Sequence, residues 1–313
     1  MLALLCSGQG AQHPGMFDLT EDAPQAQPVF EAAASLLGID PRDLVEQPNA
    51  DLHGNRTGQI LCCTAALAAW KIIDQSKPSR LVVAGYSIGD LAAWGCAGRL
   101  EPGSVLRLAA VRAEAMDAAS GEGYGLAGIR GLSLDTVTKL AERHACQLAI
   151  RNAPDSAVVG GLRTALEAVC TQAAAAGAQR AILLPVRTPS HTPLLVDASQ
   201  SFAQALARET LQRPPPGAPR LIQGLDGTTL FDPAGGLDKL ARQISQTIDW
   251  AGCLEACREL GAESVLELGP GRSLATMARD ALPGARVHAL EDFRSIEGVN
   301  AWIERRRLPL DRP

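Results

Sequence analysis

The chain has 313 residues, of which 46% are hydrophobic, and this suits one large globular domain or one with a smaller companion. Its formal net charge is −5 at pH 7, and its 29 Lys and Arg residues are spread along the chain. Nucleic-acid binding needs a concentrated basic face, so nucleic acid is excluded as the main partner. The basic cluster at 305–307 is too short to change this, and we interpret it as a solvated helix end.

The eight cysteines include no C-x-x-C pair and no histidine stands at zinc-finger spacing, so the sequence predicts neither a metal site nor a redox motif. Most of them lie in apolar runs, where a free thiol packs as a small hydrophobe, and this usage suits a reducing cytoplasm. The stretch MLALLCSGQG has no basic leader, and no apolar stretch reaches membrane-spanning length. We therefore expect a soluble, cytoplasmic protein without a membrane partner.

Short apolar runs typical of strands alternate with helical patterns through most of the chain. In chain order, the first elements are a strand, a long helix, a second strand and two helices, predicted at Leu2–Cys6, Thr57–Asp74, Arg80–Ala84, Ile88–Ala97 and Pro102–Ser120. Later strands, with helices between them, are predicted near Arg220–Gln223, Ser264–Leu268 and Arg286–Leu290. This alternation favours an α/β domain with a mostly parallel sheet.

The segment 122–186 has a different pattern and follows a glycine-rich hinge, SGEGYGLAG (120–128). Its predicted elements are strand, helix, strand, strand, helix and strand, at Tyr124–Ile129, Leu134–Arg143, Gln147–Asn152, Ala157–Gly160, Leu162–Ala176 and Arg180–Leu184. This is the ferredoxin-like order. We therefore predict a small ferredoxin-like domain at 122–186, inserted into a discontinuous large α/β domain at 1–121 and 187–313.

Residues 85–89, Gly-Tyr-Ser-Ile-Gly, fit the nucleophile elbow G-x-S-x-G between a predicted strand and a predicted helix. The tight turn leaves no room for flanking side chains, which explains the glycines. It exposes the Ser87 hydroxyl at a helix N-terminus, where free amides and the helix dipole favour developing negative charge. The backbone amide of Ile88 is the natural first oxyanion donor. The alternative is a tight strand–helix turn with a capping serine.

A serine nucleophile needs a base, and the chain offers five histidines: His13, His53, His144, His191 and His288. The second-to-last of these, His191, follows RTPS where the chain re-enters the large domain, and such crossings often form clefts. His144 is expected on the surface of the small domain, and His288 within a strand. His13 and His53 lie in polar loops and remain open as candidates.

Arg112 lies on the predicted helix Pro102–Ser120. A helix arginine is usually solvated or paired with a neighbour, and Glu114 and Asp117 are near it in sequence. The functional alternative is a planar guanidinium that binds a substrate carboxylate through two hydrogen bonds.

Six motifs, in order along nearly the whole chain, resemble those of the malonyl-CoA:acyl carrier protein transacylase family. They are GQGAQ (8–12), GYSIGD (85–90), VRAEAM (111–116), RNAPDSAVVGG (151–161), TPSH (188–191) and LELGPG (266–271). The resemblance implies the family's fold, an α/β-hydrolase-like large domain with an inserted ferredoxin-like domain. It also implies Ser87 as nucleophile, His191 as its base and Arg112 as the residue that binds the malonyl carboxylate.

The same resemblance implies the supporting residues. Gln9 and Ile88 would supply the oxyanion-hole amides, and Gln59 would line the pocket. The backbone carbonyl of Gln243 would orient the histidine in place of an acidic third triad member, and Asn152 would shape the cleft from the small domain. No metal or permanently bound cofactor is implied. The reaction would be ping-pong transfer of a malonyl group from malonyl-CoA, through a malonyl-serine, to the phosphopantetheine-type thiol of an acyl carrier protein.

Two positions depart from the commonest family pattern: Tyr86 replaces a histidine and Asp90 replaces a glutamate. Neither is required by the acyl chemistry. Tyrosine at this place resembles the transacylase (epsilon) subunit of malonate decarboxylase, whose carrier protein bears a modified dephospho-CoA arm. The resemblance favours that complex, with its other subunits as partners, over fatty-acid or polyketide synthesis.

Two other classes of protein compete with this interpretation. An α/β-hydrolase esterase or thioesterase also uses G-x-S-x-G and could draw an acid such as Asp155, but it accounts for neither the GQGAQ loop nor the inserted domain. A non-catalytic carrier-binding protein would not need an intact serine, histidine and arginine.

Overall fold

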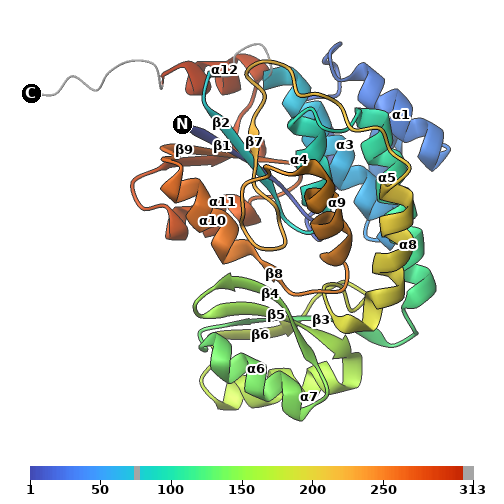
Figure 1. The fold of residues 1–313 in the computed structure, drawn as a ribbon, viewed down its shortest axis with the longest axis vertical. Helices are drawn as coiled ribbons and strands as arrows, with labels where there is room; N and C mark the ends of the chain where they lie inside the picture. The colour runs from blue at the N-terminus through green and yellow to red at the C-terminus, as the bar shows by residue number, and fades with distance from the viewer. Residues whose placement is uncertain (74–77, 306–313) are drawn as a thin grey trace, which may run out of the picture.

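The structure, a computed structural model, describes residues 1–73 and 78–305, and these residues form two β-sheets flanked by helices (Figure 1). Two sequence predictions fall outside these ranges: the last residue of the long helix, Asp74, and residues 306–307 of the basic cluster. Within the described part of the chain, no helix combines the length and the apolar character needed to cross a bilayer.

The larger sheet is parallel throughout, and its strand order in the described residues is β10-β9-β1-β2-β7. Its strands are β1 (Leu2–Cys6), β2 (Leu81–Gly85), β7 (Arg220–Leu221), β9 (Ser264–Leu268) and β10 (Arg286–Ala289). The register pairs Cys6 with both Gly85 and Leu268. The loops that follow β1, β2 and β9 therefore all leave from one edge of the sheet, the edge where ligands bind in open α/β sheets.

Helices cover both faces of this sheet. They are α1 (Gln27–Leu37), α2 (Pro41–Glu46), α3 (Asn55–Ile73), α4 (Ile88–Cys96), α5 (Pro102–Ala119), α8 (Val196–Leu206), α9 (Pro233–Arg242), α10 (Trp250–Glu259), α11 (Ser273–Ala281) and α12 (Ile296–Glu304), with short 3-10 helices at Pro14–Phe17, Pro193–Leu195 and Leu290–Asp292. Along β1, Leu2, Leu4 and Cys6 enter the core formed with α1, α3, α4 and α5, whereas Ala3 and Leu5 enter the core formed with α10 and α11. Burial on both faces explains why β1 is apolar without interruption.

The smaller sheet has the order β6-β3-β5-β4-β8 in the described residues and lies below the larger one in Figure 1. Its elements along the chain are β3 (Tyr124–Arg130), α6 (Leu134–Arg143), β4 (Gln147–Ala153), β5 (Ser156–Leu162), α7 (Arg163–Ala175), β6 (Arg180–Leu183) and β8 (Ile248–Asp249). The pairs among β3, β4, β5 and β6 are antiparallel, while β8 adds to β4 in parallel. One face packs on α6 and α7, and the other joins the α10–α11 core through Leu126, Ile150 and Val158.

Candidate active site

Ser87 lies in the turn between β2 and α4. Its backbone angles, φ 55° and ψ −118°, are rare for a residue with a side chain, and such strain clusters at functional sites. A Cβ added to Gly85 would lie 2.0 Å from the carbonyl carbon of Gly89, and one added to Gly89 would lie 2.1 Å from the carbonyl oxygen of Cys6. The two glycines therefore allow β1, β2 and α4 to meet backbone to backbone, and the Ser87 side chain stays half-buried beside that contact.

The structure brings His191 to Ser87. The distance from Ser87 Oγ to His191 Nε2 is 2.8 Å, and His191 Nδ1 lies 2.5 Å from the backbone oxygen of Gln243. Because a carbonyl oxygen only accepts, Nδ1 must carry the ring proton, and Nε2 is left to accept the proton of the serine hydroxyl. The backbone N–H of His191 also donates to the carbonyl of Ile244, at 2.8 Å. These two contacts fix both the tautomer and the position of the ring.

The imidazole of His191 is held in its neutral form. Burial, and next the positive charge of Arg112, lower the pKa of His191 to about 3, against the opposing effect of the hydrogen bond to Gln243. A neutral imidazole beside a hydroxyl is the arrangement that a general base needs. The other four histidines, all within the described residues, form no hydrogen bond with Ser87: His13 and His288 contact Glu291 and Asp292, His144 is the C-cap of α6, and His53 lines a cavity that Gln9 also lines.

Arg112 extends from α5 and is 1% exposed. Its Nη1 donates to Oε1 of Gln59 at 2.8 Å, while its Nη2 has no hydrogen-bond partner among the described residues. Burial lowers the pKa of Arg112 to about 10, so the guanidinium is charged at neutral pH. The acids near it in sequence are engaged elsewhere, since Glu114 pairs with Arg56 and Asp117 accepts from Asn55. A buried cation with an unused N–H group is suited to an anionic ligand.

The loop after β1 passes beside the nucleophile. A Cβ added to Gly8 would lie 2.9 Å from the carbonyl oxygen of Tyr86 and 3.7 Å from Cβ of Ser87. Within residues 1–73 and 78–305, the backbone N–H groups of Gln9 and Ile88 have no acceptor. Ile88 is the first residue of α4, where the helix dipole further stabilises negative charge. This arrangement is compatible with an oxyanion hole.

The sequence model of the acyl transferase domain matches residues 3–223. The chain belongs to the acyl transferase family. The malonyl CoA-acyl carrier protein transacylase of Salmonella typhimurium is 30% identical to it over 298 residues, which cover 93% of this chain and 96% of that protein. The resemblance predicted from the six motifs is thereby confirmed.

Solved structures agree with this assignment. The crystal structure of an acyl-carrier-protein S-malonyltransferase from Burkholderia pseudomallei has a TM-score of 0.87 to this acyl transferase at 29% identity, covering 96% of this chain and 99% of that one. A malonyl-transacylase in complex with its type II PKS acyl-carrier protein has a TM-score of 0.87 at 27% identity, covering 95% and 97%.

Asp90 of this acyl transferase has a contact that sequence reasoning missed. Its side chain is buried on the first turn of α4, and Oδ2 accepts from Nε2 of Gln243 at 2.9 Å and from the backbone N–H of Gly224 at 3.1 Å. Asp90 therefore fixes the side chain of Gln243, and the backbone carbonyl of Gln243 in turn accepts a hydrogen bond from His191. Burial raises the pKa of Asp90 to about 7, although the Gly224 hydrogen bond and the Arg112 charge oppose the rise. One signal was available: Asp90 is the only charged residue in an otherwise apolar helix, IGDLAAWGC.

Tyr86 links the nucleophile turn to the smaller sheet. Its hydroxyl donates to Oδ1 of Asn152 on β4 at 3.1 Å, and its ring meets Trp250 edge to face with centroids 5.4 Å apart. Burial raises the pKa of Tyr86, so the phenol stays neutral. Gln9, Tyr86 and Asn152 line one cavity of about 380 Å³, together with Glu267 from the end of β9. The two predicted positions, Gln9 in the loop after β1 and Asn152 on β4, therefore line the same cavity.

Replacing Asp90 with alanine is expected to lower the free energy of unfolding by about 1–3 kcal/mol, because two buried donors lose their acceptor.

Asp90→Asn keeps an acceptor oxygen and removes the charge. Since the folded-state pKa of about 7 lies above the ordinary value of 3.8, the ionised carboxylate costs stability, and this cost grows as pH rises toward and through 7. Urea unfolding should therefore find Asp90→Asn gaining stability relative to wild type between about pH 4 and about pH 8. If the difference in unfolding free energy between Asp90→Asn and wild type did not change with pH, this prediction would be wrong.

Proposed function

We propose that this acyl transferase moves a malonyl group from malonyl-CoA to the phosphopantetheine-type thiol of an acyl carrier protein through a malonyl ester of Ser87. The observation that carries the proposal is the buried Arg112, with its unused Nη2, whose charge acts on the His191 that is hydrogen-bonded to Ser87. The names of the relatives and of the similar structures support the donor and the carrier. No permanently bound cofactor is needed for this reaction.

In the first half-reaction, Nε2 of His191 takes the Ser87 proton as Oγ bonds to the thioester carbonyl carbon. The backbone amides of Gln9 and Ile88 stabilise the oxyanion, and Arg112 binds the malonyl carboxylate. The carbon–sulfur bond then breaks, and the imidazolium returns its proton to the leaving thiolate. The Gln243 carbonyl stabilises the imidazolium without an acidic residue at that position.

In the second half-reaction, the thiol of the carrier-protein arm gives its proton to His191 and attacks the ester carbonyl. The same two amides stabilise the second tetrahedral intermediate. Collapse breaks the bond between the carbonyl carbon and Oγ, and His191 protonates the departing serine. Gln59 holds Arg112 in place through both halves of the cycle.

Arg112→Ala is expected to shift the acyl preference from malonyl toward acetyl by about 10- to 150-fold, because charge-assisted hydrogen bonds of about 1.5–3 kcal/mol are lost for malonyl alone. Initial rates with malonyl-CoA and acetyl-CoA measure the ratio. The matched control is Arg107→Ala on the same helix, whose side chain is 56% exposed and pairs with Glu209. An unchanged ratio in Arg112→Ala would contradict the assignment of Arg112 to the carboxylate.

Mass spectrometry after incubation with malonyl-CoA, alone and with candidate carriers, tests the function. A malonyl adduct on the Ser87 peptide that disappears when a carrier gains the same mass is the expected result. Rapid release of free malonate without a carrier would favour an esterase or thioesterase. The absence of any ester on Ser87 would favour a non-catalytic carrier-binding protein.

The carrier can be assigned to one of two systems. Tyr86 favours the carrier protein of malonate decarboxylase, with the other subunits of that complex as partners. A carrier of fatty-acid or polyketide synthesis fits the comparisons at least as well, since one similar structure is a malonyl-transacylase bound to a type II PKS acyl-carrier protein. Carriers with a phosphopantetheine arm and with a modified dephospho-CoA arm, offered in competition to the malonyl-enzyme, distinguish the two systems.

We also propose a division into an α/β-hydrolase-like large domain at 1–121 and 187–313 and a ferredoxin-like small domain at 122–186. The antiparallel order β6-β3-β5-β4 supports the small domain, and β8 from the large domain extends its sheet. A cytoplasmic location is supported by the eight cysteines, all in the described residues and none in a disulfide.

A further inference from the structure

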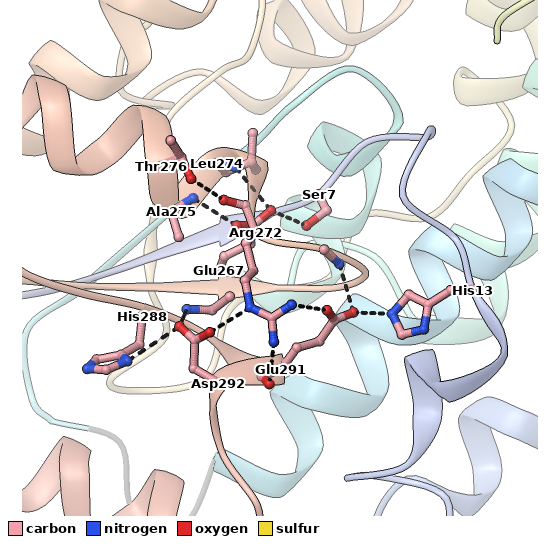
Figure 2. A network of polar contacts seen from close by, with 12 residues as sticks. Ser7, His13, Glu267, Arg272, Leu274, Ala275, Thr276, His288, Glu291 and Asp292 are labelled. Atoms are coloured by element: carbon pink, nitrogen blue, oxygen red, sulfur yellow. Dashed lines mark hydrogen bonds and ion pairs between the residues drawn. The ribbon is translucent and has the colours of Figure 1, made fainter.

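The Gln9 loop, residues 7–13, is held by a network of polar contacts that acyl transfer itself does not use (Figure 2). Two carboxylates from the C-terminal part of the chain, Glu267 and Glu291, reach the first and the last residue of this loop. The amide of Gln9 lies between the two attachment points. What these carboxylates do for the site follows from the contacts at each end.

At the first end, Oε1 of Glu267 accepts from the Ser7 hydroxyl at 2.9 Å. The same carboxylate accepts from the backbone N–H groups of Leu274 and Ala275 at the start of α11, at 3.2 and 2.7 Å. Glu267 is fully buried, and burial raises its pKa to about 7, although these hydrogen bonds oppose the rise. A carboxylate in so buried a place is tolerated because several donors satisfy it. Ser7 is thereby attached to the N-terminus of a helix.

At the last end, Oε1 of Glu291 lies 2.6 Å from Nε2 of His13 and accepts from the backbone N–H of Gly271 at 2.8 Å. Arg272 contacts the other oxygen of Glu291 at 3.4 Å and its backbone oxygen at 2.9 Å. Glu291 thus joins His13 to the turn after β9.

The turn 269–271 lies directly against the Gln9 loop. A Cβ added to Gly269 would lie 3.1 Å from Oγ of Ser7, and one added to Gly271 would lie 2.6 Å from Cβ of Ala11. Both glycines also have positive φ, 119° and 83°. The G-P-G motif is therefore explained as a close backbone support for the loop. The opposite side of the loop is held separately, by the Gln12 side chain on the carbonyl of Leu52.

We propose that Glu267 and Glu291 are positioning residues for acyl transfer, which fix the two ends of the Gln9 loop through Ser7 and His13 and so aim the Gln9 amide at the acyl oxygen on Ser87. This inference rests on the proposed function. Among the described residues, neither carboxylate forms a hydrogen bond with Ser87, although Glu267 lines the cavity of about 380 Å³ that Gln9 also lines. They act through the geometry of one oxyanion donor, whose complete removal costs about 10²–10³ in kcat in other enzymes.

The test is the infrared carbonyl stretch of the malonyl ester, formed from a thioester labelled with ¹³C at the reacting carbonyl. Ser7→Ala removes the tie at the first end and leaves the Glu267 contacts with α11 in place. Glu291→Ala removes the contact between Glu291 and His13 at the last end of the loop. In both variants a weaker hydrogen bond to the ester carbonyl should raise its stretching frequency and lower kcat about 10- to 100-fold with KM little changed.

The matched control is Asp292→Ala. Asp292 is the next residue, contacts Arg272 and the backbone N–H of Ala289, and does not touch the Gln9 loop. In Asp292→Ala, the carbonyl stretching frequency of the malonyl ester and kcat should equal those of wild type. Unchanged values in Ser7→Ala and Glu291→Ala, or equal losses in Asp292→Ala, would overturn the inference. A wild-type enzyme that forms no ester on Ser87 would instead overturn the proposed function, and this result is distinct from an ester with an unchanged stretch.

Discussion

Replacing Ser87 with alanine is expected to eliminate the covalent malonyl-enzyme and to lower the rate of transfer by as much as about 10⁶-fold, the scale seen when a serine nucleophile is removed from an enzyme. The Ser87 hydroxyl lies 2.8 Å from Nε2 of His191, the proposed base, and Ser87 immediately precedes the first residue of α4. Alanine keeps the Cβ and the strained backbone, so the turn itself is retained. Intact-protein mass spectrometry after malonyl-CoA treatment measures the adduct.

Thermal unfolding provides the control for Ser87→Ala, because the variant should unfold at nearly the wild-type temperature. Ser87 is half-buried and its hydroxyl forms one hydrogen bond among the described residues, to His191, so little stabilisation is lost. A malonyl adduct retained on folded Ser87→Ala protein would show that another side chain is acylated.

Regular elements with local signatures were predictable from the sequence. The bounds of β9 (Ser264–Leu268) and α6 (Leu134–Arg143) agree with the structure, because a buried apolar run marks the first and a serine N-cap marks the second. The strand predicted at Arg220–Gln223 is shorter than expected, since Ile222 forms an isolated antiparallel bridge with Thr229 instead of continuing β7. That bridge depends on a turn partner that periodicity does not reveal.

The nucleophile turn could be predicted because its parts are contiguous in sequence. The base could not be settled from the residues alone, since His191 is 104 residues from Ser87 and four other histidines compete. The contact between Asp90 and Gln243 spans 153 residues, and that between Ser7 and Glu267 spans 260. Such pairs become visible only when the strand order is known.

Parallel strand order explains how these distant residues meet. Because β1 lies between β2 and β9 in register, the chain leaves the same edge at Ser7, Tyr86 and Gly269. An isolated acid in an apolar segment of the sequence indicates a place where distant segments meet. Asp90 in α4 and Glu267 in β9 (SVLEL) are each the only charged residue of their element. Isolated charges of this kind must find several donors, and here those donors belong to the loops that build the site.

His191→Ala is expected to slow both half-reactions by about 10²–10⁴-fold, the usual contribution of a general base. The serine, the amide donors and Arg112 remain, so a slow acylation by malonyl-CoA should persist, in contrast to Ser87→Ala. Rapid-mixing measurement of ester formation separates the two variants. A wild-type acylation rate in folded His191→Ala protein would exclude His191 as the base.

The protonation state of His191 provides an independent check on the same assignment. A base works in its neutral form, and a pKa of about 3, well below the ordinary 6.5, keeps the ring neutral as pH falls from about 8 to about 5. Nitrogen-15 NMR should therefore find the His191 ring with its proton on Nδ1 across this range. Since the charge of Arg112 contributes to the lowered pKa, Arg112→Ala should move protonation of His191 to higher pH. If the wild-type ring took up a proton near pH 6.5, burial would not be keeping His191 neutral. The ring could then not act as a base below that pH.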